Sequence, residues 1–283
     1  MTQFRAFCEK ILRRVSRQIF HYTCPVCRMT VLSEKGICPG CLAMLAAEAE
    51  RTCPHCHRIA RECACMLSVP AGYTIGRPAR TWLAHTFYDS YEDGVLRTLL
   101  HSAKKEYKAA LFDYMASTLA GDLIRLRQSE EVSSLPDTET ALWQGCTVTW
   151  IPRSPSGYDQ YGFDQGEECA RRIAKYLGIP AMPLFVRSAG RAQKKLDAAA
   201  RRENAEHSLH LRRDVPLPNG PLFLYDDVIT TGSSMTAAVL LLAEAGVTEV
   251  FPIAFARTVR GKRPQTPTTE KGIRTENPAA GGA

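Results

Sequence analysis

The stretch that decides the fold is Leu222-Phe223-Leu224-Tyr225-Asp226-Asp227-Val228-Ile229-Thr230-Thr231-Gly232-Ser233-Ser234. Four apolar residues predict a buried strand, two carboxylates follow at its carboxyl end, and a Thr-Thr-Gly-Ser turn opens a helix. In open parallel sheets, ligands bind at the carboxyl ends of the strands. Gly232 lets the backbone approach a phosphate closely, and the N–H groups of a helix N-terminus attract the anion. The two carboxylates can accept hydrogen bonds from the vicinal hydroxyls of a ribose.

An ordinary strand-to-helix turn with a serine N-cap is the simpler interpretation of this stretch. It accounts for Gly232 and Ser233. It does not account for two acids directly after an apolar strand, and we therefore favour a site for a phosphorylated sugar.

Strands and helices alternate on both sides of this stretch. Closure by Gly178 and Gly246 marks the ends of two helices. We expect strands at 81–88, 148–152, 222–225 and 250–256, and helices from about 93, at 109–127, 164–177 and 234–245. This order predicts an α/β fold with a parallel sheet. A short basic helix in residues 1–20, a polar loop at 129–140 and a disordered tail at 261–283 complete the prediction.

Length and composition exclude several classes of protein. The chain has 283 residues, enough for two domains of roughly 100–200 residues, and its 45% hydrophobic content excludes a wholly disordered chain. Its longest apolar runs, 41–47 and 237–243, fall far short of the about 20 residues that a membrane-spanning helix needs. Charged residues interrupt the first ten positions, so no secretory signal is expected there. We expect a cytoplasmic protein.

Nine of the 11 cysteines lie in the first 65 residues. Clustered cysteines in a reduced compartment indicate metal binding rather than disulfides. Two Cys-x2-Cys knuckles ten residues apart predict one tetrahedral zinc site on four thiolates. Its ligands are Cys24, Cys27, Cys38 and Cys41.

A second zinc site is expected on Cys53, Cys56, Cys63 and Cys65. Its Cys-x-Cys end is one residue short, which leaves open whether His55 or His57 replaces one of the last two cysteines. Both sites are interpreted as structural, because a segment this short cannot build a core of its own.

The chain carries a net charge of +7, and a basic segment spans residues 187–202. Arginine clusters bind phosphates. The segment therefore suits either a flexible hood over a phosphorylated ligand or a patch for single-stranded nucleic acid, and the sequence does not choose between them.

Residues 222–234 resemble the binding loop for phosphoribosyl pyrophosphate (PRPP) of type I phosphoribosyltransferases. The resemblance implies that Asp226 and Asp227 hold the ribose hydroxyls while residues 230–234 hold the 5-phosphate. The implied PRPP-binding residues are Asp226, Asp227, Val228, Ile229, Thr230, Thr231, Gly232, Ser233 and Ser234. PRPP binds together with Mg²⁺, and Arg153, Arg187 and Arg191 are the candidates for the pyrophosphate side.

With the cysteine ribbons ahead of it, this loop resembles the ComF family of double zinc ribbon, phosphoribosyltransferase-like proteins. Further similar pieces are Tyr161-Gly-Phe-Asp-Gln165, the lysine cluster at 104–108 and the basic series from Arg187 to Asn204. Tyr161 stands where the family usually has arginine. The resemblance implies a zinc-ribbon region at 1–70 and a phosphoribosyltransferase-like α/β domain at 71–260, with the tail at 261–283.

The family resemblance implies a PRPP-binding component of the machinery that takes up single-stranded DNA in natural transformation. The alternative is a phosphoribosyltransferase of nucleotide or nucleoside metabolism that releases pyrophosphate from PRPP, and a third is a purely structural zinc adaptor. A salvage enzyme is not expected to carry zinc ribbons, so we favour the first.

Overall fold

The computed structural model describes residues 22–31, 36–53, 56–60, 84–89, 94–128, 143, 145–188, 208–247 and 249–258. The predicted basic helix at 1–20, the polar loop at 129–140 and the tail at 261–283 lie outside the described residues, as do Cys63 and Cys65 of the second predicted zinc site.

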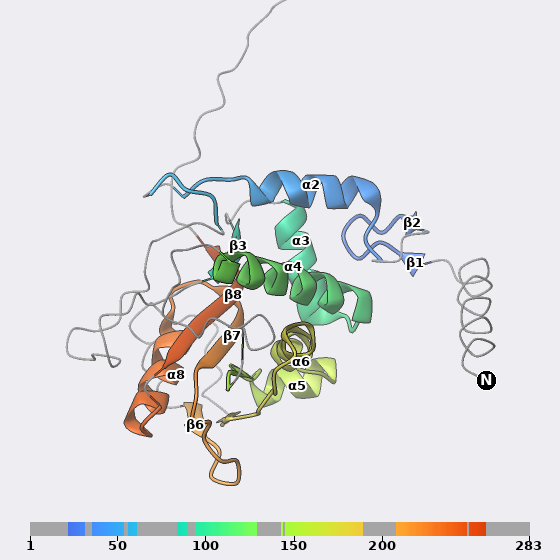
Figure 1. Ribbon diagram of the computed structural model, residues 1–283. Helices are drawn as coiled ribbons and strands as arrows, with labels where there is room; N and C mark the ends of the chain where they lie inside the picture. Colours follow the sequence, from blue (N-terminus) through green and yellow to red (C-terminus); the bar gives the residue numbers. More distant parts are fainter. Residues whose placement is uncertain are drawn as a thin grey trace, which may run out of the picture.

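A sheet of parallel strands forms the centre of the molecule (Figure 1). Its order is β3–β8–β7–β4, and every neighbouring pair is parallel. The strands are β3 (Ala84–Asp89), β4 (Thr147–Trp150), β7 (Leu222–Ile229) and β8 (Val250–Thr258). All correspond to predicted strands, and β7 runs four residues further than expected. The predicted fold class, a parallel α/β sheet with helices, is confirmed.

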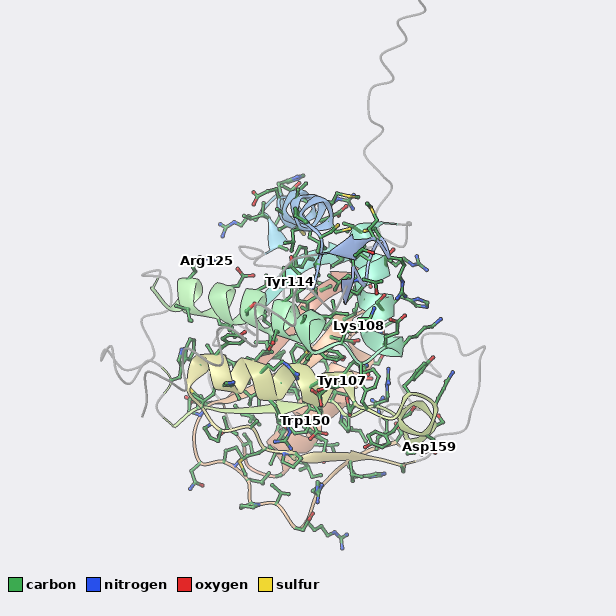
Figure 2. The ribbon with its side chains drawn as sticks, turned by 90° about the vertical axis from the view of Figure 1, so that its right-hand side faces the viewer. Tyr107, Lys108, Tyr114, Arg125, Trp150 and Asp159 are labelled. Atoms are coloured by element: carbon green, nitrogen blue, oxygen red, sulfur yellow. The ribbon has the colours of Figure 1, made fainter. Side chains whose placement is uncertain are left out.

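The alternation of side chains along β7 divides the core into two layers. Phe223 and Tyr225 point into a core shared with α4 (Ala109–Gln128) and α6 (Gln165–Leu177), while Leu222 and Leu224 point into a second core under α8 (Ser233–Glu244). On the first face, Tyr114 of α4 packs edge-on against Phe255 of β8, with ring centroids 6.5 Å apart (Figure 2). Helices thus cover both faces of the sheet, as a parallel sheet requires.

Local signals set the helix boundaries. Asp164 caps α6 by accepting from the N–H groups of Gly166 and Glu167, and Gly178 ends the helix in the left-handed conformation. The predicted apolar face of α4 is fully buried, through Leu111, Met115, Leu119 and Leu123. The short helix α5 (Pro155–Tyr161) buries no residue and follows β4 directly.

The cysteine ribbon packs onto the α/β body. It consists of the hairpin β1 (Tyr22–Thr23) and β2 (Thr30–Val31) and the helix α2 (Pro39–Ala49). Helix α2 contacts α3 (Val95–Lys105) and β3, and Cys24, Cys41 and Leu45 belong to the same buried cluster as Leu99 of α3. The ribbon therefore shares its apolar core with the sheet and helices.

Two further features lie at the margin of the sheet. Strands β5 (Phe185–Arg187) and β6 (Leu209–Leu211) form an antiparallel pair, and β6 packs against α8. The outer edge of β4 is covered by residues 180–182: Val148 donates to Pro180 O and accepts from Met182 N–H, with a parallel bridge to Ala181. No helix among the described residues is long and apolar enough to cross a membrane.

Two glycines bring the starts of β4 and β7 together. Gly220 lies against Gly145, so that a methyl group at Gly220 would overlap the carbonyl oxygen of Gly145. We expect Gly220→Ala to separate these strand starts and to lower the free energy of unfolding by about 1–3 kcal/mol. Denaturant titration measures this. Gly40→Ala is the control, because a methyl there meets nothing within 4 Å; equal loss in both variants would contradict the explanation.

Candidate functional site

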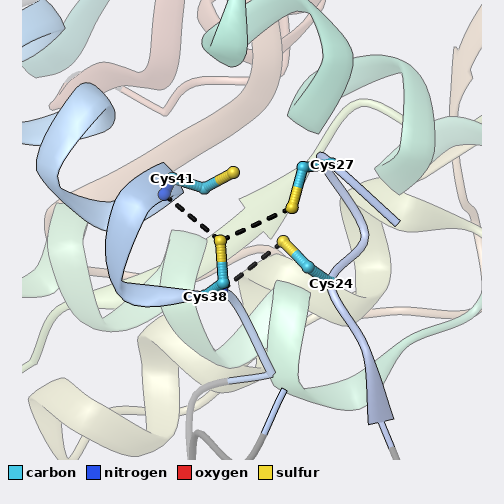
Figure 3. Close-up of side chains that lie close together, drawn as sticks. All are labelled: Cys24, Cys27, Cys38 and Cys41. Carbon is cyan, nitrogen blue, oxygen red and sulfur yellow. Dashed lines mark hydrogen bonds between the residues drawn. The ribbon is translucent and has the colours of Figure 1, made fainter. Parts of the chain in front are cut away.

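Four cysteines of the ribbon converge on one point (Figure 3). The sulfur atoms of Cys24, Cys27, Cys38 and Cys41 all lie within 4.8 Å of one another. Cys27 Sγ and Cys38 Sγ are 3.5 Å apart, close to the roughly 3.8 Å edge of a tetrahedron with 2.3 Å zinc–sulfur bonds. Backbone N–H groups of Cys38 and Cys41 donate to Cys24 Sγ and Cys38 Sγ. The four ligands predicted for the first site are therefore together, in an arrangement that fits zinc.

The knuckle at Cys53 and Cys56 repeats the backbone of the knuckle at Cys24 and Cys27. In the first, Cys24 N–H donates to Met29 O (2.7 Å) and Arg28 N–H donates to Cys24 O (2.9 Å). In the second, Cys53 N–H donates to Arg58 O and His57 N–H donates to Cys53 O at the same two distances. Arg28 and His57 both have positive φ, 62° and 57°. Even the flanking strand pairs correspond, Thr23 with Thr30 and Thr52 with Ile59.

Half of the second predicted zinc site thus has the backbone of a metal knuckle. Cys53 is buried and Cys56 is partly exposed. The left-handed residue of this knuckle is His57, whereas His55, Cys63 and Cys65 lie outside the described residues.

The predicted phosphate loop follows β7 and leads into α8. Gly232 is the N-cap of α8 with φ 77°, a left-handed conformation that favours glycine, and it has no side chain with which to cap the helix. The Thr231 hydroxyl accepts from Ser233 N–H at 3.4 Å. The Thr231 and Ser233 hydroxyls lie 2.9 Å apart, and Thr230 and Thr231 are exposed. A helix N-terminus whose N-cap lacks a side chain keeps N–H donors of its first turn and the positive end of its dipole for an anion.

Asp226 and Asp227 lie inside β7 rather than after it, because the strand pairs with β8 as far as Ile229. Each carboxylate accepts a hydrogen bond from the backbone N–H of the next residue. Asp227 N–H donates to Asp226 Oδ1 (2.9 Å) and Val228 N–H donates to Asp227 Oδ1 (2.8 Å). These bonds hold two neighbouring acids at the carboxyl half of a buried strand.

A lysine that was noted in sequence only as part of a cluster meets these acids. Lys104 Nζ, from the last turn of α3, lies 3.3 Å from Asp227 Oδ2. That oxygen is buried and accepts no hydrogen bond among the described residues, so Lys104 is its compensating charge. The charges of Asp227 and, more weakly, Asp226 raise the pKa of Lys104 against the effect of its burial.

Asp226 differs from an ordinary surface carboxyl group in its pKa. Burial and the neighbouring charge of Asp227 raise the pKa of Asp226 to about 8, although Lys104 opposes the shift. The raised pKa favours the protonated form of Asp226, which lessens the repulsion between the two neighbouring acids.

Arg153, which follows β4, contacts the end of α3 and residues 161–164. Its guanidinium donates to Phe163 O (3.1 Å) and to Lys104 O, and it lies 4.6 Å from the ring centroid of Tyr161. The backbone N–H of Arg153 donates to the buried carboxylate of Asp164 (2.8 Å). The structure therefore places Arg153 next to Lys104 and Asp164, with its guanidinium bound to two backbone carbonyls and lying over the ring of Tyr161.

Arg187 lies at the phosphate loop itself. Its Nη2 donates to Ser234 Oγ (3.3 Å), and its buried Nε has no hydrogen-bond partner among the described residues. Burial lowers the pKa of Arg187, and the charge of Asp226 opposes this. Beyond it, Ser188 N–H donates to Ser208 O (2.8 Å), which joins the two described residues on either side of 189–207. Arg191 and the rest of that segment lie outside the described residues.

Sequence analysis missed two residues of this site. Lys104 is 123 positions from Asp227 in the numbering, and no spacing relates the end of a helix to a distant strand. Asp164 carried a signal, since an acid directly before an amphipathic helix is an N-cap, but its bond to Arg153 is a tertiary contact.

Comparisons with known proteins agree with this description in part. No protein-family model matches the chain. The chain is similar to the DNA utilization protein YhgH of Salmonella typhimurium, 25% identical over 239 residues that cover 83% of this chain and 97% of that protein. It is also similar to the DNA utilization protein YhgH of Escherichia coli K12, 24% identical with the same coverage.

Two solved structures show partial similarity to this chain. Adenine phosphoribosyltransferase from Leishmania tarentolae matches at 16% identity and a TM-score of 0.32, over 57% of this chain and 74% of that one. A glutamine PRPP amidotransferase from B. subtilis matches at 20% identity and a TM-score of 0.31, over 51% of this chain and 26% of that one. At these low scores, it is the geometry of the β7–α8 loop that supports a phosphate site.

We expect Cys27→Ser to lower the zinc content of the purified protein by one ion per chain. It should also lower the unfolding midpoint of the whole α/β body, because Cys24 and Cys41 belong to the main core and the binding energy of a structural zinc is folding energy. Elemental analysis and thermal unfolding measure the two effects. Cys146→Ala, outside the four-thiol cluster, should keep its zinc; a Cys27→Ser protein with unchanged zinc would refute the site.

The raised pKa of Asp226 predicts a particular dependence of stability on pH. Because the folded protein holds this proton more tightly than the unfolded chain does, ionising Asp226 costs stability as the pH rises from about 4 to about 8. Asp226→Asn cannot ionise, so its stability relative to wild type should increase across that range. Urea midpoints at pH 5, 6.5 and 8 measure the difference. The exposed pair of Asp214 with Arg212 lowers the pKa of Asp214, so Asp214→Asn should show no such trend. A flat difference for Asp226→Asn would contradict the shift.

Proposed function

We propose that the chain binds PRPP at the carboxyl edge of its sheet, as a phosphoribosyltransferase-like protein of the ComF family. One observation carries the proposal: the N-terminus of α8, where the N-cap Gly232 provides no side chain, follows a strand that holds two adjacent acids. The loop has donors for a phosphate and the strand has acceptors for hydroxyls. These donors and acceptors together suit a ligand that carries a phosphate a short distance from a diol.

Residues of this site can be assigned to the phosphate, the ribose and the pyrophosphate of PRPP. Residues 230–234 would receive the 5-phosphate. Arg187 was expected from sequence on the pyrophosphate side, but it donates to Ser234 Oγ and is therefore proposed for the 5-phosphate. Asp226 and Asp227 would accept from the ribose hydroxyls. Lys104 and Arg153 stand on the other side of the acids and, with Arg191, are the candidates for the pyrophosphate. Mg²⁺ bound with PRPP would neutralise part of the pyrophosphate charge.

The raised pKa of Asp226 favours the binding of a polyanion. When Asp226 is protonated, the charge of Asp227 is balanced by Lys104, and the site repels PRPP less than two ionised carboxylates would. A protonated carboxyl group can also donate one hydrogen bond and still accept others.

We further propose a role in the use of DNA taken up by the cell. Support comes from the DNA utilization proteins to which the chain is similar, and from its net charge of +7. The basic segment at 187–202 is the candidate contact for single-stranded DNA. Reduced zinc-binding thiols fit the cytoplasm, and natural transformation is the setting that the family resemblance implies.

A second zinc ion belongs to the same proposal. The repeated knuckle at Cys53 and Cys56 supports it, because two thiolates in this geometry need a second pair to close a tetrahedral site. Cys63 and Cys65 are the proposed partners, with His55 or His57 as possible replacements.

The test is calorimetric titration of three proteins with PRPP and Mg²⁺, and separately with inorganic phosphate. We expect Asp227→Asn to weaken PRPP binding by about ten- to a hundredfold, since hydrogen bonds to charged groups contribute about 1.5–3 kcal/mol each. It should leave phosphate binding intact, because the phosphate needs only the loop. Gly232→Ala should weaken both ligands, since alanine is strained at φ 77°.

The control is Asp214→Asn, an acid of the turn after β6 that pairs with Arg212 and lies outside the site. It should bind both ligands as wild type does. Wild-type protein that fails to bind PRPP at millimolar concentration refutes the proposal. Single-stranded DNA titrated in the same buffer tests the DNA role separately, and binding there should weaken steeply with salt.

A further inference from the structure

The last turn of α3 is held between the zinc knuckle and the acid pair. Helix α3 ends at Lys105, and Glu106 caps it by donating its N–H to Ser102 O. Within these five residues, Ser102 and Glu106 contact the knuckle and Lys104 contacts Asp227. Figure 2 labels Tyr107 and Lys108, which continue the chain from this turn.

Two contacts bind the turn to the knuckle. The buried Ser102 hydroxyl donates to Pro25 O at 2.6 Å, and Pro25 lies between the ligands Cys24 and Cys27. Arg28, the left-handed residue that follows Cys27, donates both Nη atoms to the Glu106 carboxylate, at 2.8 and 2.5 Å. A two-bond arginine–carboxylate pair fixes orientation as well as distance.

Two contacts bind the same turn to the acid pair. Lys104 Nζ faces Asp227 Oδ2, and Arg153 donates to Lys104 O. The lysine stem is therefore anchored at its backbone while its ammonium group meets the carboxylate. A displacement of the turn would move the charge that balances Asp227.

We infer that Arg28 and Glu106 are positioning residues: through them the zinc knuckle sets the place of Lys104 against Asp226 and Asp227. The zinc ribbon thus acts on the sheet edge by holding one lysine, in addition to its share of the core. The consequence for PRPP rests on the function proposed above, whereas the position of Lys104 does not.

The pKa of Asp226 reports the position of Lys104 without any ligand. The charged groups that act on Asp226 are Asp227 of its own strand, Lys104 of α3 and Arg187 of β5. Of these, Lys104 lowers the pKa of Asp226, so a lysine that moves away must raise it. Arg187 and Asp227 make no contact with Arg28 or Glu106, so their effect stays constant.

The experiment follows the Asp226 carboxyl carbon by NMR in ¹³C-aspartate protein across a pH titration, assigned with Asp226→Asn. We expect Glu106→Gln and Arg28→Gln each to raise the Asp226 pKa by about 0.3–0.7 unit, the range that an exposed ion pair can supply. Glu106 also pairs with Lys108 at 3.0 Å, so the part of the shift that is due to the Arg28–Glu106 pair is the part that both single variants share and the double variant does not increase. Lys104→Met gives the upper limit of the shift. Zinc content should stay at the wild-type value.

The matched control is again Asp214→Asn, because Arg212 and Asp214 also form a two-bond exposed pair, at 3.1 and 2.5 Å. It should leave the Asp226 pKa unchanged. An unchanged pKa in Glu106→Gln, which replaces no neighbour of a zinc ligand, overturns the inference, and so does an equal shift in Asp214→Asn.

Titration of the same variants with PRPP separates the two proposals. We expect Glu106→Gln to bind PRPP about two- to fivefold more weakly than wild type. A shifted Asp226 pKa in a protein that never binds PRPP leaves the positioning role standing and removes the proposed function. If wild type binds PRPP but the Asp226 pKa is unshifted in Glu106→Gln, the proposed function stands and the positioning role is removed.

Discussion

The ion pair between Lys104 and Asp227 is the contact on which the rest of the site depends. Two adjacent carboxylates in a buried strand repel each other and lose hydration, and a cation is needed within a few ångströms to hold one of them ionised. The lysine comes from a helix far from the strand in sequence. The fold must therefore bring α3 to the carboxyl edge of the sheet before the acids can serve as acceptors.

The ribbon and the residues at the edge of the sheet both hold the end of α3 in place. The ribbon contributes Cys24, Cys41 and Leu45 to the main core and fastens the end of α3 through Pro25 and Arg28. Arg153 fastens the same turn from the opposite side, and Asp164 fastens the backbone of Arg153 in turn. Hydrogen bonds from neighbouring segments thus hold the turn that carries Lys104 and the backbone of Arg153. These bonds limit the movement of the two cationic side chains.

Sequence patterns predicted the strands, the helix ends and the first zinc site because each depends on residues close together in the chain. Apolar runs predicted β7 and β8, Gly178 predicted the end of α6, and two knuckles predicted the thiol cluster. The length of β7 was underestimated because acids are rare inside strands, and here local hydrogen bonds to the following N–H groups stabilise them. The places of Lys104 and Arg187 could not be predicted, since both follow from packing between distant elements.

The covering of β4 by residues 180–182 has a consequence for self-association. A strand at the margin of a sheet offers free backbone groups to a strand of another molecule. On the β4 side those groups of Val148 are already used by Pro180 and Met182, so the sheet is closed to extension there. Within the described four-stranded sheet, this leaves β3 as the margin at which another chain could add, and α2 of the ribbon contacts this strand.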